Sequence, residues 1–188
     1  PLDYRLITTV APAVAKAAIE SGVARHTITD WDGYVNELDK RLGLDNKLLK
    51  SVQHRACMDP KTVVFAEADH RKILKAAQIV KDEGIAIPIL LGNRKVIREM
   101  MTEFSIDLGD VTIIDPREAE SEKLRKEFGK LFFEKRKRRG YTLREAEKIM
   151  RERNYFGSAM VETGQADALI SGLTRNYPDT IRPALQVI

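Results

Sequence analysis

The stretch Asp59–Asn93, DPKTVVFAEADHRKILKAAQIVKDEGIAIPILLGN, decides the fold class. It contains two short apolar runs, Thr62–Ala66 and Ile85–Leu91, of the β-branched composition that is typical of buried parallel strands. Between them Ile73, Leu74, Ala77 and Val80 recur at helical spacing. A strand, a helix and a second strand with short connections predict a βαβ unit and hence a parallel sheet.

The same alternation continues toward the C-terminus. Thr142 with Glu145 three residues later forms the sequence signature of a capping box, which marks a helix start. The further predicted elements are a strand at Val111–Pro116, one long charged helix at Arg117–Gly140, helices at Thr142–Met150 and Tyr155–Thr163, a strand at Asp167–Gly172 and a helix at Asp179–Ile188. The sequence therefore predicts an α/β fold with a parallel sheet and helices on both faces.

Residues 1–57 carry no strand pattern. Three successive helices are predicted: Leu6–Gly22, a helix from Trp31 to Leu42 that Gly43 ends, and Asp45–Cys57. We expect an all-helical arm over residues 1–57 followed by an α/β domain over residues 58–188. Because the chain starts without Met and stops inside an apolar run at Val187-Ile188, we read it as a fragment of a longer protein.

Composition excludes several classes of protein. The 32 basic residues face 28 acidic ones, so the net charge of +4 by itself does not predict a nucleic-acid partner. No apolar run reaches the roughly 18 residues that a membrane span needs, so we expect no membrane partner. The single cysteine excludes an internal disulfide and suits the reducing cytoplasm, where we place the protein. His26, His54 and His70 are scattered, so we predict no metal site.

Two strand ends could carry chemistry, because open α/β sheets bind ligands beyond the carboxyl ends of their strands. One is Glu67–Arg71. The other is the loop from Ser171 to Pro183, where small residues and a helix N-terminus would offer free N–H groups to an anion. Its candidate binding residues are Ser171, Gly172, Arg175, Thr180 and Arg182. The alternative is a plain strand–loop–helix turn with surface arginines, since glycine is scarce for a phosphate loop.

The run Lys135–Gly140 is the densest cluster of charge. It fits a helix C-terminus, where cations complement the helix dipole and Gly140 ends the helix. A nucleic-acid patch is the alternative, but no stacking aromatics are visible nearby. The sequence also lacks the nucleophile elbow Gly-x-Ser-x-Gly and the dinucleotide fingerprint Gly-x-Gly-x-x-Gly, so we assign no catalytic residue and no cofactor to this chain.

Four motifs together resemble the phosphate acetyl/butyryl-transferase family in order and spacing: Val63–Ala68, Ile85–Asn93, Ala166–Gly172 and Asp179–Gln186. In addition, Arg5–Ile7, Ala11–Ala18 and Glu20–Ala24 resemble the end of the catalytic part of bacterial malic enzymes. The two resemblances occur together in the large NADP-dependent malic enzymes, in which a transacetylase-like domain follows the oxidoreductase.

This double resemblance implies a parent enzyme that decarboxylates malate oxidatively to pyruvate with NADP and a divalent metal, Mg or Mn, bound before residue 1. It also implies a three-layer phosphotransacetylase-like domain that acetyl-CoA regulates. In the family, two arginines bind the phosphate-bearing substrate or coenzyme A, and by motif position they correspond to Arg136 and Arg182. Here Leu173–Pro178 replaces a stretch of the Ala-His-Ser/Thr type, which argues against transferase activity.

Three hypotheses follow. The leading one is a regulatory domain that binds acetyl-CoA, acetyl phosphate or phosphate. An active phosphate acetyltransferase is the second, and a nucleic-acid binder that uses Lys135–Arg139 is the third. We also expect a homo-oligomer, at least a dimer, because the helical arm must bury Trp31, Tyr34, Leu38 and Leu42 on this domain or on a neighbouring chain.

Overall fold

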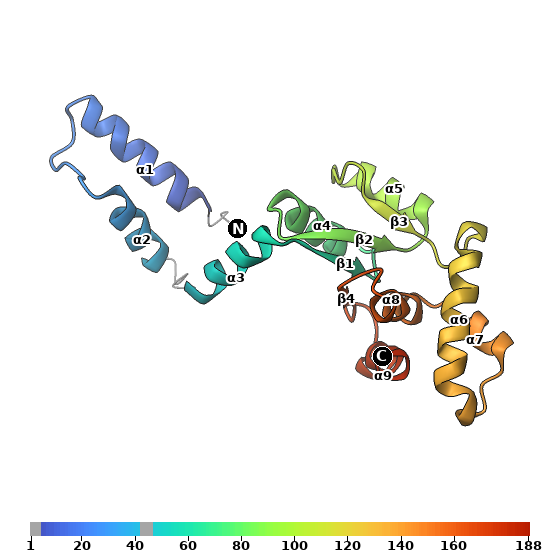
Figure 1. Ribbon diagram of the computed structural model, residues 1–188. Helices are drawn as coiled ribbons and strands as arrows, with labels where there is room; N and C mark the ends of the chain where they lie inside the picture. Colours follow the sequence, from blue (N-terminus) through green and yellow to red (C-terminus); the bar gives the residue numbers. More distant parts are fainter. Residues whose placement is uncertain (1–4, 42–46) are drawn as a thin grey trace. The chain divides into compact units, whose positions relative to one another are not determined.

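Figure 1 shows a computed structural model of the protein, which describes residues 5–41 and 47–188. Contacts within the chain divide it into two units, Pro1–Val52 and Gln53–Ile188. Our boundary at residues 57 and 58 stays a prediction. The predicted Leu42, Gly43 and Asp45 lie outside the described residues.

The first unit is helical, as predicted. Helix α1 spans Arg5–Glu20 and helix α2 spans Trp31–Arg41, while α3, Lys47–Met58, crosses the boundary between the units. Lys16 Nζ lies 5.0 Å from the centre of the Trp31 ring, a cation–π contact that joins α1 to α2. Trp31 and Tyr34 meet edge to face at 6.1 Å, and Leu38 is buried.

The second unit contains a parallel sheet of four strands in the order β3-β2-β1-β4. The strands are β1 (Lys61–Phe65), β2 (Ala86–Leu91), β3 (Thr112–Ile114) and β4 (Ala168–Ile170). Each strand lies within the run that was predicted for it, apart from Lys61, which extends β1 by one residue. The α/β class with a parallel sheet is therefore confirmed.

Helices cover both faces of this sheet, because successive strand residues point to opposite sides. The helices are α4 (Arg71–Asp82), α5 (Arg94–Glu103), α6 (Glu122–Arg136), α7 (Leu143–Ile149), α8 (Arg153–Glu162) and α9 (Tyr177–Val187). Val64 and Leu91 pack into one apolar cluster with α6, α7, α8 and α9, while Phe65 and Leu90 pack into a second cluster with α4 and α5. The three layers that the fold class implies are present.

The prediction of one long helix over Arg117–Gly140 was wrong at both ends. The chain first makes a 3₁₀ turn, η1 (Ala119–Ser121), and α6 gives way after Arg136 to a second one, η2 (Lys137–Arg139). The Asp115 carboxylate accepts from Arg117 N at 2.9 Å, and its carbonyl accepts from Ser121 Oγ at 2.7 Å. These side chain–backbone bonds compete with the helix and delay its start.

Two helix ends follow the sequence signals closely. The capping box at Thr142 and Glu145 is present at the start of α7. Helix α9 starts two residues before the predicted Asp179, with Pro178 in its first turn, where the missing N–H costs nothing.

Within residues 5–41 and 47–188, no helix has both the length and the apolar character of a membrane span.

Candidate functional site at the ends of β1 and β4

The order of the strands reverses at β1. The chain adds β2 and then β3 on one side of β1, and it places β4 on the other side. Such a switch point leaves a crevice beyond the carboxyl ends of the two strands that flank it, and α/β proteins bind ligands there. Here those ends are followed by Glu67 and by the loop that starts at Ser171.

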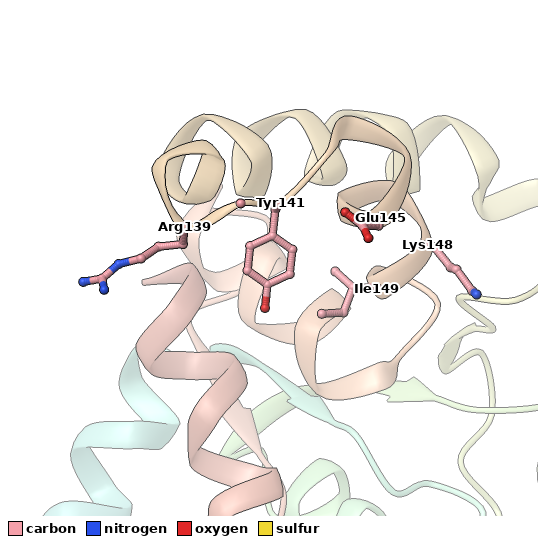
Figure 2. Close-up of a pocket in the computed structure, with 6 residues that line it drawn as sticks. Arg139, Tyr141, Glu145, Lys148 and Ile149 are labelled. Carbon is pink, nitrogen blue, oxygen red and sulfur yellow. The ribbon is translucent and has the colours of Figure 1, made fainter.

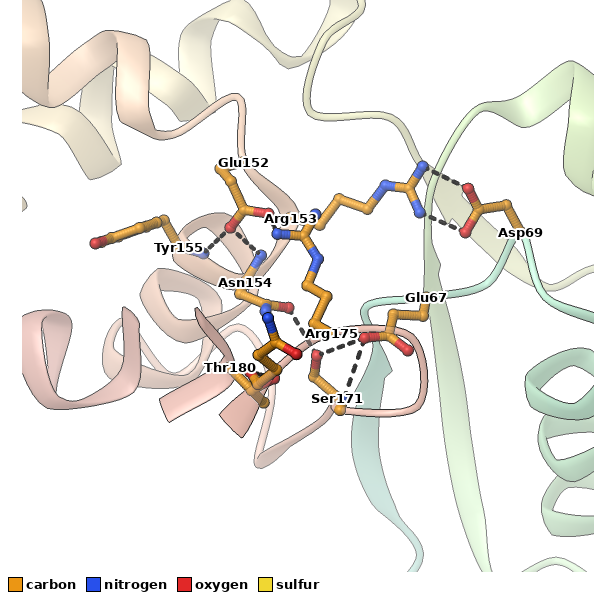
Figure 3. A network of polar contacts seen from close by, with 11 residues as sticks. Glu67, Asp69, Glu152, Arg153, Asn154, Tyr155, Ser171, Arg175 and Thr180 are labelled. Carbon is orange, nitrogen blue, oxygen red and sulfur yellow. Dashed lines mark hydrogen bonds and ion pairs between the residues drawn. The ribbon is translucent and has the colours of Figure 1, made fainter. Parts of the chain in front are cut away.

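The Glu67 carboxylate fills this crevice. Its Oε2 accepts from the backbone N–H groups of Leu173 and Thr174, both at 2.9 Å, and its Oε1 accepts from Gly172 N at 3.2 Å. Figure 3 shows Glu67 beside Ser171 at the start of this loop. Ser171 Oγ lies 3.3 Å from the same Oε1. The loop thus forms a concave set of amide donors around an anion, and the anion belongs to the chain itself.

Hydrogen bonding keeps Glu67 charged although it is only 4% exposed. Burial alone would raise its pKa, but the amides of Gly172, Thr174 and Leu173 and the Ser171 hydroxyl together lower the pKa below its ordinary value. The predicted binding groups at Ser171 and Gly172 therefore already have a partner, and their binding of an external anion stays a prediction.

A buried amide extends this network. Ser171 Oγ lies 2.9 Å from Asn154 Oδ1, and Asn154 is only 1% exposed. The serine hydroxyl has one proton, so it donates to Asn154 or to Glu67 but not to both at once. Asn154 Nδ2 has no partner among the described residues. Turning the amide by 180° would let Nδ2 donate to Ser171 and Ser171 donate to Glu67, so that the serine and the amide each donate one bond in this network.

Two ion pairs flank the network at the start of α8. Arg153 Nη1 and Nη2 bind the two carboxylate oxygens of Asp69 at 2.5 and 2.8 Å, a bidentate pair that bridges α8 and the end of β1 (Figure 3). The hydrogen bonds from Arg153 lower the pKa of Asp69. The predicted Arg175 makes an ion pair with Glu152, with Nη1 and Oε1 2.7 Å apart. The charge of Arg175 is therefore partly neutralised within the chain.

The structure brings the predicted Arg136 and Arg182 to the same part of α9. Arg136 donates from Nε to the Gln186 carbonyl at 2.9 Å and from Nη2 to the Leu185 carbonyl at 2.6 Å. Arg182 lies four residues before Gln186 and so on the same helix face. Arg182 is exposed and makes no hydrogen bond or ion pair with any residue that the structure describes.

Tyr155 binds the same end of α9 as Arg136. It is 8% exposed, and its hydroxyl donates to Gln186 Oε1 at 2.7 Å. Burial raises the pKa of Tyr155, whereas the charges of Arg182 and Arg136 act in the opposite direction. Tyr155 and Arg136 both bind groups of Gln186 near the end of α9, the helix that carries Arg182.

The remaining predicted residue, Thr180, has a local role in this structure. Its Oγ1 donates to the Asn176 carbonyl at 3.1 Å, and its methyl carbon lies 3.5 Å from where a Cβ on Gly172 would stand.

Sequence reasoning missed Glu152, Asn154 and Tyr155. These residues stand at the start of α8, which is buried from Asn154 to Met160, and no sequence signal marks them as neighbours of the loop. In the described part of the chain, no cluster of three or more His, Cys, Asp or Glu side chains could hold a metal ion.

Comparisons with known proteins agree with this architecture. Residues 47–188 match the family profile described as phosphate acetyl/butaryl transferase. The chain belongs to this family. A solved phosphotransacetylase from Streptococcus pyogenes superposes with a TM-score of 0.67 and 32% identity, over 77% of this chain and 43% of that one.

The relatives are of two kinds. The NADP-dependent malic enzyme of Salmonella typhimurium is 35% identical over 178 residues, which are 94% of this chain and 24% of that protein. The phosphate acetyltransferase of Thermoanaerobacterium thermosaccharolyticum is 38% identical over 141 residues, 75% of this chain and 42% of that protein. The predicted resemblance to both groups is confirmed, and the chain spans about a quarter of the length of the malic enzymes that it matches.

Proposed function

We propose that this chain is the transacetylase-like part of a longer NADP-dependent malic enzyme and that it regulates that enzyme by binding acetyl-CoA or a related anion. The malic enzymes that the chain matches over 94% of its length support the first half of the proposal. The second half rests on the residues around α9. We place the parent protein in the cytoplasm and expect it to form a homo-oligomer.

The observation that carries the binding proposal is the exposed Arg182 on α9, the helix whose carbonyls Arg136 binds. Arg136 uses Nε and one N–H of Nη2 on the carbonyls of α9, so three of its five N–H donors remain for a ligand. Arg182 has all five donors free of the described residues. A planar guanidinium group with free donors suits a phosphate or an acyl phosphate, which can accept two parallel hydrogen bonds from it.

The loop after β4 favours a domain that binds its ligand without transferring an acetyl group. The resemblance implies hydroxyl groups and a histidine where this chain has Leu173–Pro178. Here the first two amides of that segment are bound to Glu67, and Arg175 is bound to Glu152. The donors that could polarise a reacting acyl group are thus used within the chain.

NADP and a divalent metal would belong to the other part of the longer protein. The 188 residues contain no dinucleotide fingerprint, and the described residues contain no metal-binding cluster. The residues of this chain do not fit either group, so we route no chemical step through them.

Replacing Arg182 tests the binding site. We expect R182A to weaken the binding of acetyl-CoA and of acetyl phosphate about tenfold or more, since a hydrogen bond to a charged group contributes about 1.5–3 kcal/mol. Calorimetric titration measures this. The matched control is R98A, which removes an exposed arginine from α5 at the opposite face of the sheet. Equal affinities for R182A and the unaltered protein would remove Arg182 from the site.

Active phosphate acetyltransferase is the second candidate, and the 38% identity to such an enzyme favours it. A coupled assay that follows acetyl-CoA formation from acetyl phosphate and coenzyme A decides between the two. Turnover that disappears in R182A would establish the transferase. Binding without turnover would support the regulatory domain.

A further inference from the structure

A pocket between α6 and α7 is lined by charged side chains. Its volume of about 450 Å³ falls in the range of pockets that bind small molecules, about 300–1,000 Å³. None of its lining residues is aromatic or aliphatic, so a nucleotide base or an acyl chain would find no complementary surface there. Five basic and two acidic residues line it, with a net charge of +3: Glu122, Arg125, Lys126, Arg144, Glu147, Lys148 and Arg151.

Gly129 allows α6 and α7 to approach each other closely beside this pocket (Figure 1). A Cβ on Gly129 would lie 2.8 Å from the Cα of Glu147 and 3.0 Å from its backbone nitrogen, so a side chain here would push the two helices apart. Arg125 lies four residues before Gly129, and Arg144 lies three residues before Glu147. Both arginines therefore belong to the helix faces that meet at the pocket.

Arg125 is a buried cation with donors to spare. It is only 7% exposed, and its Nη1 donates to the carbonyls of Pro116 at 2.7 Å and Glu118 at 2.5 Å, which fixes the guanidinium group. The N–H groups of its Nε and Nη2 make no hydrogen bond with any residue that the structure describes, and no described carboxylate forms an ion pair with it. A buried charge is costly unless it is paired, so this cation calls for an anion in the pocket.

The exposed cations of the pocket are only partly neutralised. Lys126 pairs with Glu122, with Nζ and Oε1 2.7 Å apart. Arg144 and Arg151 are exposed, and neither guanidinium group makes a hydrogen bond or an ion pair within the described part of the chain. The second carboxylate of the lining, Glu147, can offset only one of these charges. Positive charge therefore remains in excess.

Lys148 completes a row of three cations. It also borders a pocket of about 520 Å³ around Tyr141 and Ile149, but Figure 2 shows its side chain extending away from both of these residues. Arg144, Lys148 and Arg151 are spaced by four and three residues, which places them one above the other along α7 and the turn that follows it. Like charges at this spacing repel each other, and an anion bound between them would relieve the repulsion.

We propose that this pocket binds a small di- or tricarboxylate, whose carboxylate groups pair with the row Arg144, Lys148 and Arg151 and with the buried Arg125. Guanidinium groups bind carboxylates through two parallel hydrogen bonds. A phosphate group concentrates up to about two negative charges at one point. The cations here are spread over two helical turns, which suits single charges on separate carbon atoms. The site uses none of the arginines of the proposed function, so it is a second site for a different class of ligand.

The test titrates the protein with tricarballylate, which has three carboxylates, and with acetate, which has one. Calorimetry at about 0.15 M salt should show that tricarballylate binds at least about tenfold more tightly than acetate. We expect R144A/R151A to weaken tricarballylate binding about tenfold or more. The matched control R98A/R138A removes two exposed arginines outside the pocket and should leave the affinity unchanged within about twofold.

Three outcomes would overturn the inference. Equal binding of tricarballylate and acetate, or equal weakening by R144A/R151A and R98A/R138A, would mean that only diffuse charge attracts the ligand. Binding that is lost in R182A but kept in R144A/R151A would place the carboxylates at α9. Pyrophosphate that binds as tightly as tricarballylate, and is weakened alike by R144A/R151A, would refute the assignment to carboxylates.

The proposed function is tested separately by the R182A titration with acetyl-CoA, and R182A should leave tricarballylate binding unchanged. Circular dichroism shows whether R144A/R151A keeps its fold. If it does not, R151A replaces it, because this exposed residue lies after the end of α7. Unchanged tricarballylate binding in R151A would then refute the site.

Discussion

Glu67 gives the loop after β4 an internal counter-anion. Three successive amides and a hydroxyl surround its carboxylate in a buried position. An amide cluster of this kind binds a phosphate in many α/β proteins. In this chain it binds the carboxylate of Glu67, two residues after the end of β1, and these bonds fix the loop that leads into α9.

Replacing this carboxylate should cost stability. We expect E67Q to lower the free energy of unfolding by about 2 kcal/mol at neutral pH, because an amide group puts an NH₂ donor against backbone donors. Chemical denaturation measures the change. The control is E99Q, whose carboxylate is exposed and lies 3.9 Å from Lys95 Nζ, and its effect should stay within about 0.5 kcal/mol.

The difference in the free energy of unfolding between the unaltered protein and E67Q should depend on pH. The pKa of Glu67 is lower in the folded protein than its ordinary value of 4.5. A lowered pKa means that the contribution of the charge to stability is fully present above about pH 4.5 and is lost as the pH falls through the folded-state pKa. The stability gap between the unaltered protein and E67Q should therefore be constant from pH 6 to 8 and shrink in acid. A gap that grows in acid would contradict this assignment.

The sequence predicted Glu67 and Ser171 as ends of strands but not as partners. Both follow apolar runs, and the carboxyl ends of parallel strands meet at one edge of a sheet. Which strands are neighbours depends on the packing of α6, α8 and α9 over the sheet, and β4 pairs with β1 only in that context. Arg136 was predicted from a motif position, while its bonds to the carbonyls of α9 depend on the tertiary fold.

At the scale of the elements, local signals were reliable where side chains bind their own backbone. The capping box of α7 is such a case, because Thr142 and Glu145 satisfy each other's donors within four residues. The start of α6 was predicted wrongly, because Asp115 and Ser121 form a turn that competes with the helix through side chain–backbone hydrogen bonds. Such a turn has no hydrophobic periodicity by which the sequence could reveal it.

The capping box gives a prediction for α7. We expect T142A to lower the free energy of unfolding by about 1 kcal/mol, the usual loss when an N-cap hydroxyl is removed. Thermal or chemical unfolding measures it. T102A serves as the control, because Thr102 Oγ1 donates to the Arg98 carbonyl inside α5, and removing this bond should change stability by less than about 0.5 kcal/mol. Equal losses of stability in T142A and T102A would show that the capping box stabilises the protein no more than a single hydroxyl bond inside a helix does.

At the scale of the whole molecule, several of the basic side chains that make the net charge positive bind other groups of the same chain. In the run Lys135–Arg139, Lys135 pairs with Glu162, Arg136 binds carbonyls of α9 and Lys137 pairs with Glu134. Only the last two arginines of the run have no such partner within the described residues. A nucleic-acid surface needs several phosphate contacts, each of which adds to the dependence of binding on salt.

We therefore expect no binding of duplex or single-stranded DNA at physiological salt. Fluorescence anisotropy of a labelled oligonucleotide should stay flat when the protein is added. The matched control is the charge-reversed variant R138E/R139E, which should give the same flat signal. Binding that weakens steeply with salt and disappears in this variant would revive the nucleic-acid hypothesis.

The clamp on Glu67 also has a consequence for how the protein acquires its shape. The groups that it joins are 104 to 107 residues apart along the chain. Contacts between such distant segments form late, because closing a long loop costs entropy before any contact compensates for it. During synthesis the helices near β1 and β2 can form early, but the loop from which α9 starts must wait until β4 leaves the ribosome and docks beside β1.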